Sequence, residues 1–200
     1  MQLEVIILAA GQGTRMKSSL PKVLHPLAGR PLLEHVITKA FSLQPSAVHV
    51  VVGHGAEQVR DRLAAFPVNW IVQHEQLGTG HGVLQAVPAL SPDSTVLVLY
   101  GDVPLIGTDT LAALVAAAAS GPALLTAQLN DPAGYGRILR DSAGALVGVV
   151  EQKDASAAQL EISEINTGLL AAPARDLMQY LPLVGNNNKQ GEYYLPDILS

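Results

Sequence analysis

Short apolar runs alternate with stretches of helical periodicity along the first 130 residues. Continuous apolar runs predict strands at Leu3–Leu8, Val48–Val52, Trp70–Gln73, Thr95–Tyr100 and Ala123–Leu129. Apolar residues at helical spacing predict helices at Leu32–Phe41, Ala56–Ala65, Thr79–Leu90 and Thr108–Ala119. Because strands that are apolar throughout need cover on both faces, this alternation predicts a three-layer α/β fold with a Rossmann-like, mostly parallel sheet.

The pattern changes after Asn130. Two short strands, Arg137–Leu139 and Leu146–Glu151, are separated by turn residues and predict a β-hairpin. A turn-rich stretch then precedes a last element at Tyr193–Ser200. We therefore expect a single domain over residues 1–200, with one half at about 1–129 and a second half at about 130–200 that contains the hairpin.

Composition excludes several classes of protein. The chain has 200 residues, of which 48% are hydrophobic and 14% charged, so it is not intrinsically disordered. It has no cysteine, which excludes disulfides, thiolate zinc sites and a cysteine nucleophile. The net charge of -5 argues against nucleic-acid or membrane-surface partners. The start of the chain lacks the basic region of a signal peptide, and no apolar run approaches the roughly 20 residues of a membrane span, so we expect a cytoplasmic protein.

Positive charge is concentrated near the N-terminus. Arg15, Lys17, Lys22 and Arg30 occur among the first 33 residues with a single carboxylate, Glu4. A basic cluster in an acidic chain indicates a pocket for a small anion, such as a phosphate chain. Chance clustering of exposed cations is the alternative.

A glycine-rich turn, Gly11-Gln12-Gly13-Thr14-Arg15-Met16, directly follows the first predicted strand. Glycines allow the backbone to approach a ligand closely and to direct N–H groups at phosphate oxygens. The turn is not a Walker A loop, because Met16 stands where that loop needs glycine, and it lacks the third glycine of the dinucleotide fingerprint. A plain strand-to-helix turn is the alternative.

Polar residues also follow later predicted strands. The amide of Gln73 offers a donor and an acceptor, which suits the imide edge of uracil, and Thr79 is a candidate N-cap of the next helix. Asp102 lies where ligands bind in open α/β sheets, and a carboxylate there suits Mg²⁺. Glu151 and Asn166 have the chemistry that binds sugar hydroxyls and an N-acetyl group. From the residues alone, an ordinary surface amide, cap or turn residue is the alternative for each, and it is the favoured interpretation for Gln73, Glu151 and Asn166.

Other catalytic chemistries lack support in the sequence. The six histidines have no metal-ligand spacing, and we expect them to be structural or solvent-facing. No Gly-x-Ser-x-Gly elbow is present, so a serine nucleophile of that type is excluded.

The glycine turn and the Pro21-Lys22 pair after it resemble the signature of the sugar-1-phosphate nucleotidyltransferases. Further segments that match in family order are Gln73–His81, Tyr100–Leu105, Asp131–Arg137, Val150–Asp154, Glu164–Gly168 and Asn186–Tyr194. Together they resemble the uridyltransferase domain of the bacterial bifunctional N-acetylglucosamine-1-phosphate uridyltransferases. The resemblance covers nearly the whole chain.

This resemblance implies Mg²⁺-dependent uridylyl transfer from UTP to N-acetylglucosamine-1-phosphate, which yields UDP-N-acetylglucosamine and pyrophosphate for peptidoglycan and lipopolysaccharide synthesis. It implies catalytic roles for Arg15 at the pyrophosphate, Lys22 at the α-phosphate and Asp102 at the metal. The nucleotide-binding residues it implies are Leu8, Ala9, Ala10, Gly11, Gly13, Thr14, Arg15, Lys22, Gln73, Gln76, Gly78 and Thr79. The sugar-phosphate residues it implies are Tyr100, Gly101, Gly136, Glu151, Asn166 and Tyr194.

The sequence departs from the family at its end. The family's domain continues past Ser200 and carries its second metal ligand, an asparagine, in that part. The family's acetyltransferase domain, a β-helix through which the parent enzymes form homotrimers, is absent, and Pro196 stands where related sequences can carry a hydroxyl residue. We therefore expect a C-terminally incomplete domain with weak activity. A cytidylyl- or guanylyltransferase and a non-catalytic nucleotide-binding domain are the alternatives.

Overall fold

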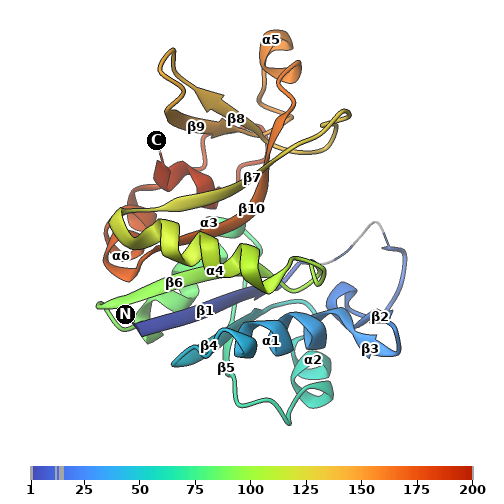
Figure 1. Ribbon diagram of the computed structural model, residues 1–200. Coiled ribbons are helices and arrows are strands. Elements are labelled where there is room, and N and C mark those ends of the chain that lie inside the picture. The colour runs from blue at the N-terminus through green and yellow to red at the C-terminus, as the bar shows by residue number, and fades with distance from the viewer. Residues whose placement is uncertain (1, 12, 14–15, 200) are drawn as a thin grey trace.

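The structure, a computed structural model, describes residues 2–11, 13 and 16–199. Its main sheet has the strand order β5-β4-β1-β6-β10-β8-β9, with β7 also paired to β10 (Figure 1). The parallel part consists of β1 (Gln2–Ala9), β4 (Ala47–Val52), β5 (Asn69–Val72) and β6 (Ser94–Tyr100). The predicted α/β fold with a mostly parallel sheet is therefore confirmed.

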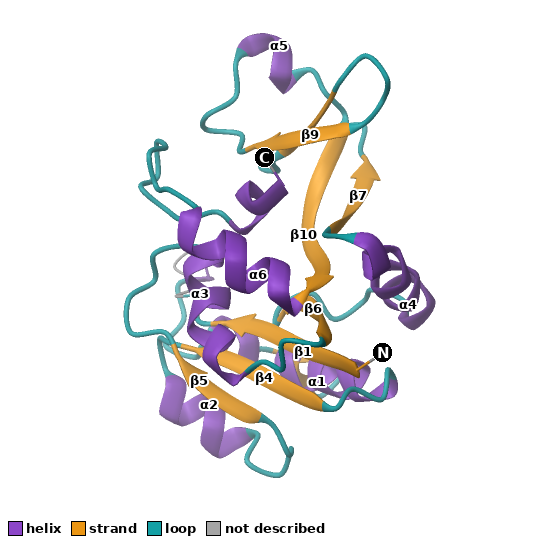
Figure 2. Ribbon diagram, turned by 90° about the vertical axis from the view of Figure 1, so that its left-hand side faces the viewer, coloured by secondary structure: helices purple, strands orange, loops and turns teal. Residues whose placement is uncertain are grey.

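Helices cover both faces of this parallel part. One face carries α1 (Leu32–Ser42), α2 (Ala56–Arg62) and α4 (Thr108–Ala117), and the other carries α3 (Thr79–Ala86) and α6 (Ala174–Tyr180) (Figure 2). Along β1, Val5 and Ile7 pack on the first side and Ile6 packs on the second. Because successive side chains of a strand point to opposite faces, two hydrophobic cores require a strand that is apolar at every position.

The other half of the sheet is antiparallel. Strand β10 (Glu164–Pro173) runs from the parallel part of the sheet to the hairpin (Figure 2) and pairs antiparallel with β6, with β7 (Ala123–Gln128) and with β8 (Arg137–Arg140). The predicted hairpin is confirmed, since β8 pairs antiparallel with β9 (Leu146–Val150). A short helix, α5 (Ala157–Leu160), begins at a capping box and leads into β10.

Several predicted elements needed correction. The sequence analysis missed β10 and α6, because β10 has a polar start and a register shift between Asn166 and Leu170 that interrupts its pattern. Helix α2 ends at Arg62 rather than Ala65. Helix α3 ends at Ala86 rather than Leu90, because Pro88 has no N–H to continue the helix and lies in a 3-10 turn.

Short elements connect the larger ones. A 3-10 turn at Lys22–Leu24 leads into the two-stranded ribbon of β2 (Pro26–Leu27) and β3 (Arg30–Pro31). The last predicted element is a 3-10 helix at Leu195–Leu199, whose apolar side chains pack into the second core with α3 and α6. None of the described helices has the length and apolar character needed to cross a membrane.

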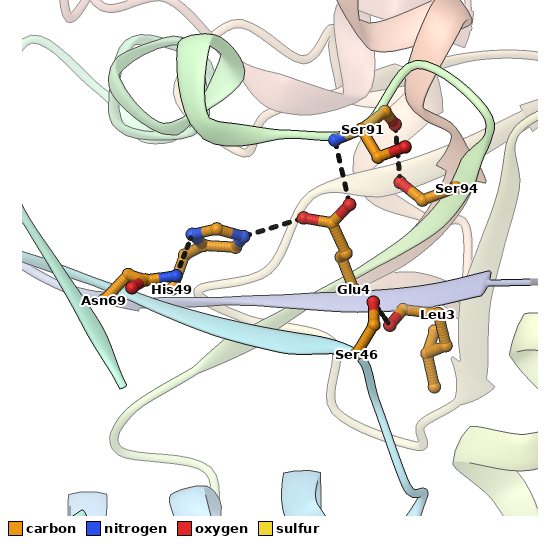
Figure 3. Close-up of polar contacts among 7 residues, drawn as sticks. All are labelled: Leu3, Glu4, Ser46, His49, Asn69, Ser91 and Ser94. Atoms are coloured by element: carbon orange, nitrogen blue, oxygen red, sulfur yellow. Dashed lines mark hydrogen bonds and ion pairs between the residues drawn. The ribbon is translucent and has the colours of Figure 1, made fainter. Parts of the chain in front are cut away.

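A buried polar cluster lies at the amino-terminal ends of the parallel strands (Figure 3). Glu4 and His49 are 3% and 1% exposed, and their Oε2 and Nε2 atoms are 2.8 Å apart. The other carboxylate oxygen of Glu4 accepts from the Ser91 N–H at 2.9 Å, and Asn69 contacts the His49 ring at 3.4 Å. These bonds join β1, β4, β5 and the loop before β6 at the edge opposite to the carboxyl ends of the strands.

Candidate active site

The carboxyl ends of β1, β5 and β6 surround a cavity of about 540 Å³. Its lining consists of Leu8, Ala9, Ala10, Gly11, Gly13, Met16, Lys22, Val23, Gln73, Gln76, Gly78, Thr79, Gly82, Tyr100, Asp102 and Glu192. Ligands of open α/β sheets bind at this edge. Every nucleotide-binding residue expected from the sequence that the structure describes lines this cavity, and Thr14 and Arg15 lie outside the described residues.

The glycine turn folds back onto the Lys22 segment. Gly13 has a φ of +60°, and a Cβ added there would lie 2.8 Å from the Cβ of Lys22. The Met16 N–H closes the turn by donating to the carbonyl of Gly13 at 2.9 Å. A larger residue at position 13 would be strained and would push Lys22 away, so the glycine sets the distance between the turn and this lysine.

Lys22 and Asp102 form an ion pair within the cavity. Lys22 Nζ lies 2.5 Å from Asp102 Oδ2, and the side chains are 43% and 24% exposed. Gly101 packs against Leu33, Val23 and Ala9 and thereby fixes the start of the loop that carries Asp102. The pair is accessible, so an incoming phosphate can take over the lysine while the carboxylate is released for another cation.

The site around Asp102 has an oxygen ligand that is compatible with a divalent cation. Mg²⁺ is bound in many phosphate-transfer sites by one or two carboxylates together with substrate phosphates and water. Asp102 is one oxygen ligand of the required kind, and it lies in a cavity whose glycine turn suits phosphate. Among the described residues, no three histidine or acidic side chains converge to hold a metal by themselves.

Gln73 lies at the inner wall of the cavity and is 4% exposed. Its Nε2 donates to the carbonyl of Gly78 at 3.3 Å and lies 2.9 Å from Nδ1 of His81. The side chain of Gln76 donates to the main-chain carbonyl of Gln73 at 3.0 Å. The nitrogen of the Gln73 side-chain amide is therefore held by Gly78 and His81.

The segment after residue 191 clamps the loop that follows Gln73. The Tyr193 N–H donates to the carbonyl of Leu77 at 2.8 Å, and the Gly80 N–H donates to the carbonyl of Tyr193 at 2.8 Å. A Cβ on Gly78 would lie only 2.6 Å from the Tyr193 oxygen, so only glycine allows this approach. The clamp also brings Glu192 to the cavity. This residue lies in the matched segment Asn186–Tyr194, but no role was predicted for it.

Thr79 has a different role from the predicted one. The N-cap of α3 is Gly78, and no side chain caps this helix. The Thr79 hydroxyl instead accepts from the Leu195 N–H at 3.0 Å and forms a hydrogen bond with Tyr100. Thr79 therefore links the clamp to the tyrosine at the end of β6.

Tyr100 lies between the cavity and the hairpin side of the molecule. Desolvation of the phenol, followed by the charge of Glu151, raises the pKa of Tyr100 far above its usual value. Gly168, with a φ of +84°, makes room for the ring, since a Cβ there would lie 2.7 Å from Tyr100 Cε2. This phenol stays neutral and can donate a hydrogen bond throughout the physiological pH range.

A second, shallower hollow of about 340 Å³ contains Glu151 and Tyr194, two of the expected sugar-phosphate residues. A Cβ on Gly136 would lie 2.8 Å from Glu151 Oε1, so this glycine is closely packed against the carboxylate. The Asn166 N–H donates to the Gly136 carbonyl at 2.9 Å. Burial, followed by Asp154 and then Asp197, raises the pKa of Glu151. Of the expected sugar-phosphate residues, only Glu151 and Tyr194 line this hollow, whereas Gly136 and Asn166 contact each other beside Glu151 and Tyr100 lines the first cavity.

Known proteins with similar sequences were found. The family described as MobA-like NTP transferase domain matches residues 5–162. The bifunctional protein GlmU of Alkalilimnicola ehrlichii is 58% identical over 198 residues, which cover 99% of this chain and 43% of the relative. GlmU of Pseudomonas entomophila is 59% identical over 201 residues, which cover 100% of this chain and 44% of the relative. The chain therefore spans less than half the length of these relatives.

Solved structures share the fold. A UDP-glucose pyrophosphorylase complexed with UDP-glucose superposes with a TM-score of 0.80 at 16% identity, covering 100% of this chain and 86% of that chain. HddC from Yersinia pseudotuberculosis superposes with a TM-score of 0.69 at 17% identity, covering 96% and 83%. At these identities the likeness extends to the fold alone.

Proposed function

The chain belongs to the family of MobA-like NTP transferase domains, and from that premise we propose that it transfers the uridylyl group of UTP to N-acetylglucosamine-1-phosphate in the cytoplasm. The products are UDP-N-acetylglucosamine and pyrophosphate. The observation that carries this proposal is the 540 Å³ cavity, where three segments far apart in sequence contribute a glycine turn with Lys22, a buried glutamine and an aspartate. The 58–59% identity to bifunctional GlmU proteins supports this choice of substrates.

The base is selected at Gln73. Uracil presents an N–H between two carbonyl oxygens, and the buried amide oxygen of Gln73 can accept from that N–H. A site built to hydrogen-bond a particular group rejects an analogue that lacks it, because its own buried groups would stay unpaired. Gly78 and Gly82 line the cavity next to Gln73 and leave space for a flat ring.

The phosphates extend along the glycine turn towards Lys22. In the reaction, a phosphate oxygen of the sugar phosphate attacks the α-phosphorus of UTP in line. The bond from that phosphorus to the bridging oxygen breaks, and pyrophosphate leaves with the electron pair. No protein nucleophile is needed, so the enzyme acts by positioning and by neutralising charge. Lys22 neutralises charge near the α-phosphate, and we assign Arg15 to the leaving pyrophosphate.

Asp102 is the residue that would hold Mg²⁺. The ion, when bound, neutralises phosphate oxygens and draws charge away from the transferred group. Lys22 pairs with this carboxylate at 2.5 Å. When substrate phosphates bind, Lys22 pairs with a phosphate instead of Asp102, and Asp102 becomes available to the metal ion. The protein's own contribution is to keep both groups at the same end of the cavity.

The sugar phosphate occupies the second hollow, beside Tyr100. Glu151 accepts hydrogen bonds from sugar hydroxyls, and Asn166 offers an amide to the N-acetyl group. Tyr194 lines the hollow together with Glu151, and Gly136 packs against the Glu151 carboxylate. The charge of Glu151 acts on Tyr100, which lines the nucleotide cavity, and this supports placing the two subsites side by side for an in-line attack on the α-phosphorus.

Pyrophosphate release tests the proposal. The chain is incubated with Mg²⁺, N-acetylglucosamine-1-phosphate and either UTP, CTP, GTP or ATP. Release is expected with UTP and the sugar phosphate together, and Asp102→Asn should abolish it. The matched control is Asp109→Asn, which changes an aspartate in the first turn of α4 outside the cavity. Equal release with CTP or GTP would overturn the uridylyl assignment, and equal rates for D102N and wild type would overturn the role of Asp102.

A further inference from the structure

We infer that His81 is a specificity-determining residue that acts through Gln73. Its imidazole Nδ1 holds the Gln73 amide in the orientation that accepts from uracil and disfavours cytosine. The sequence analysis gave His81 a structural or solvent-facing role, and this histidine does not itself line the cavity. The inference rests on the proposed function, in which Gln73 reads the base.

The hydrogen bonds of the Gln73 amide determine which way it faces. A backbone carbonyl can only accept, so the edge of the amide that lies 3.3 Å from the Gly78 oxygen has to be the NH₂ group. The same nitrogen lies 2.9 Å from Nδ1 of His81. Two donors cannot bond to each other, so Nδ1 of His81 carries no proton and accepts. Both Gln73 amide protons are then used within the protein.

Only the oxygen of the Gln73 amide is then available to bind a ligand. Gly82 lines the cavity, and a Cβ added to it would lie 3.3 Å from Gln73 Oε1. The oxygen therefore lies at the cavity wall next to a residue without a side chain. An acceptor there matches the ring N–H of uracil, whereas the corresponding ring nitrogen of cytosine is itself an acceptor. The orientation of one amide thus decides between the two pyrimidines.

His81 is itself held in place by two neighbours. Gln85, one helical turn further along α3, has its Nε2 3.2 Å from Nε2 of His81 and 3.3 Å from the main-chain carbonyl of His81, and the Tyr193 ring lies with its centroid 6.3 Å from that of His81. Both ring nitrogens thus face an amide nitrogen, and a neutral imidazole has only one acceptor, so we assign the acceptor to Nδ1, which has the shorter contact of 2.9 Å. The proton is then on Nε2, and the Gln85 amide has to turn its oxygen towards it and give up the longer bond to the His81 carbonyl.

The hydrogen bond to the Gly78 carbonyl is too weak by itself to fix the orientation of the Gln73 amide. A distance of 3.3 Å is at the long end for an N–H to O bond, whereas the contact to His81 is of ordinary length at 2.9 Å. Without the acceptor on His81, rotation of the amide by half a turn forfeits only the longer bond. A rotated amide presents NH₂ to the base, which suits the ring nitrogen of cytosine.

Calorimetric titration with UTP and with CTP tests this inference. His81→Leu removes the acceptor, and we expect the preference for UTP over CTP to fall about three- to tenfold, the effect of one neutral hydrogen bond. His81→Asn places an oxygen at the position of Nδ1 and should retain the preference. The matched control is His35→Leu, because His35 lies on α1 outside the cavity, bonded to the Leu27 carbonyl.

The outcomes separate this inference from the proposed function. A merely structural His81 would lower the melting temperature or weaken UTP and CTP equally, and an unchanged UTP-to-CTP ratio in H81L overturns the inference. Wild-type protein that binds UTP no better than CTP overturns the uridylyl assignment instead. Nitrogen-15 NMR of the wild type gives a test that needs no variant. An unprotonated Nδ1 on His81 supports the inference, and a protonated one overturns it even if H81L does not fold.

Discussion

Gly78→Ala tests whether the clamp, the two hydrogen bonds of Tyr193 with Leu77 and Gly80, requires a residue without a side chain at position 78. Gly78 has a φ of +110° and a ψ of 176°, a region that only glycine occupies readily and that costs other residues about 1–3 kcal/mol. Its added Cβ would also lie 2.6 Å from the oxygen and 2.9 Å from the nitrogen of Tyr193. These backbone atoms make the two hydrogen bonds of the clamp, each worth about 0.5–1.5 kcal/mol. The expected loss of unfolding free energy is therefore about 2–6 kcal/mol.

Two other glycines serve as controls in the same denaturation experiment. Gly144 has a φ of +84° with no atom within 4 Å of an added Cβ, so Gly144→Ala measures backbone strain alone, about 1–2 kcal/mol. Gly107 has an ordinary φ of -67° and its nearest neighbour at 3.7 Å, so Gly107→Ala should change stability by less than about 0.5 kcal/mol. Only Gly78→Ala should also weaken UTP binding in calorimetry. Equal losses for G78A and G144A would refute the clamp.

Three further changes have expected outcomes. Lys22→Ala should weaken UTP binding in calorimetry by about 1.5–3 kcal/mol, the range for a charged hydrogen bond, and Lys17→Ala, outside the cavity, should not. Glu4→Ala leaves the His49 ring buried without its hydrogen-bond partner and should cost about 1–3 kcal/mol in urea denaturation; a loss below about 0.5 kcal/mol contradicts this. The raised pKa of Glu151 means that the folded state holds this proton more tightly, so stability falls as pH rises above the unfolded value of about 4.3. Glu151→Gln should remove part of that fall, and identical pH profiles would disprove it.

The parallel half of the fold was predictable because local pattern and tertiary structure agree there. Strands β1, β4 and β6 are buried on both sides, as the two cores on either face of β1 show, and continuous apolar runs are the direct consequence, whereas the edge strand β5 is only partly buried. Strand β10 was missed for the opposite reason. Its first residues lie beyond the parallel strands, where β10 extends towards the hairpin. Gly168 then interrupts the run of apolar residues and makes room for Tyr100.

The candidate site was predictable where a motif carries its chemistry locally, as in the glycine turn with Lys22. Contacts between segments that are distant in the sequence could not be predicted in this way. The clamp of Tyr193 on Leu77 and Gly80 consists of backbone hydrogen bonds, which leave no signature in side-chain pattern. Thr79 has the residue type of an N-cap, but its hydroxyl is used by the Leu195 N–H from more than a hundred residues away.

Thermal unfolding with a panel of nucleotides tests the central claim most directly, because a ligand that binds only the native state raises its melting temperature. UTP, CTP, GTP and ATP are compared at equal concentration with Mg²⁺, on the wild type and on Lys22→Ala. The account predicts a rise with UTP that exceeds the rise with each of the other three and that shrinks in K22A. Equal rises with all four nucleotides, or a UTP effect that K22A leaves intact, would contradict a uridine nucleotide site in this cavity.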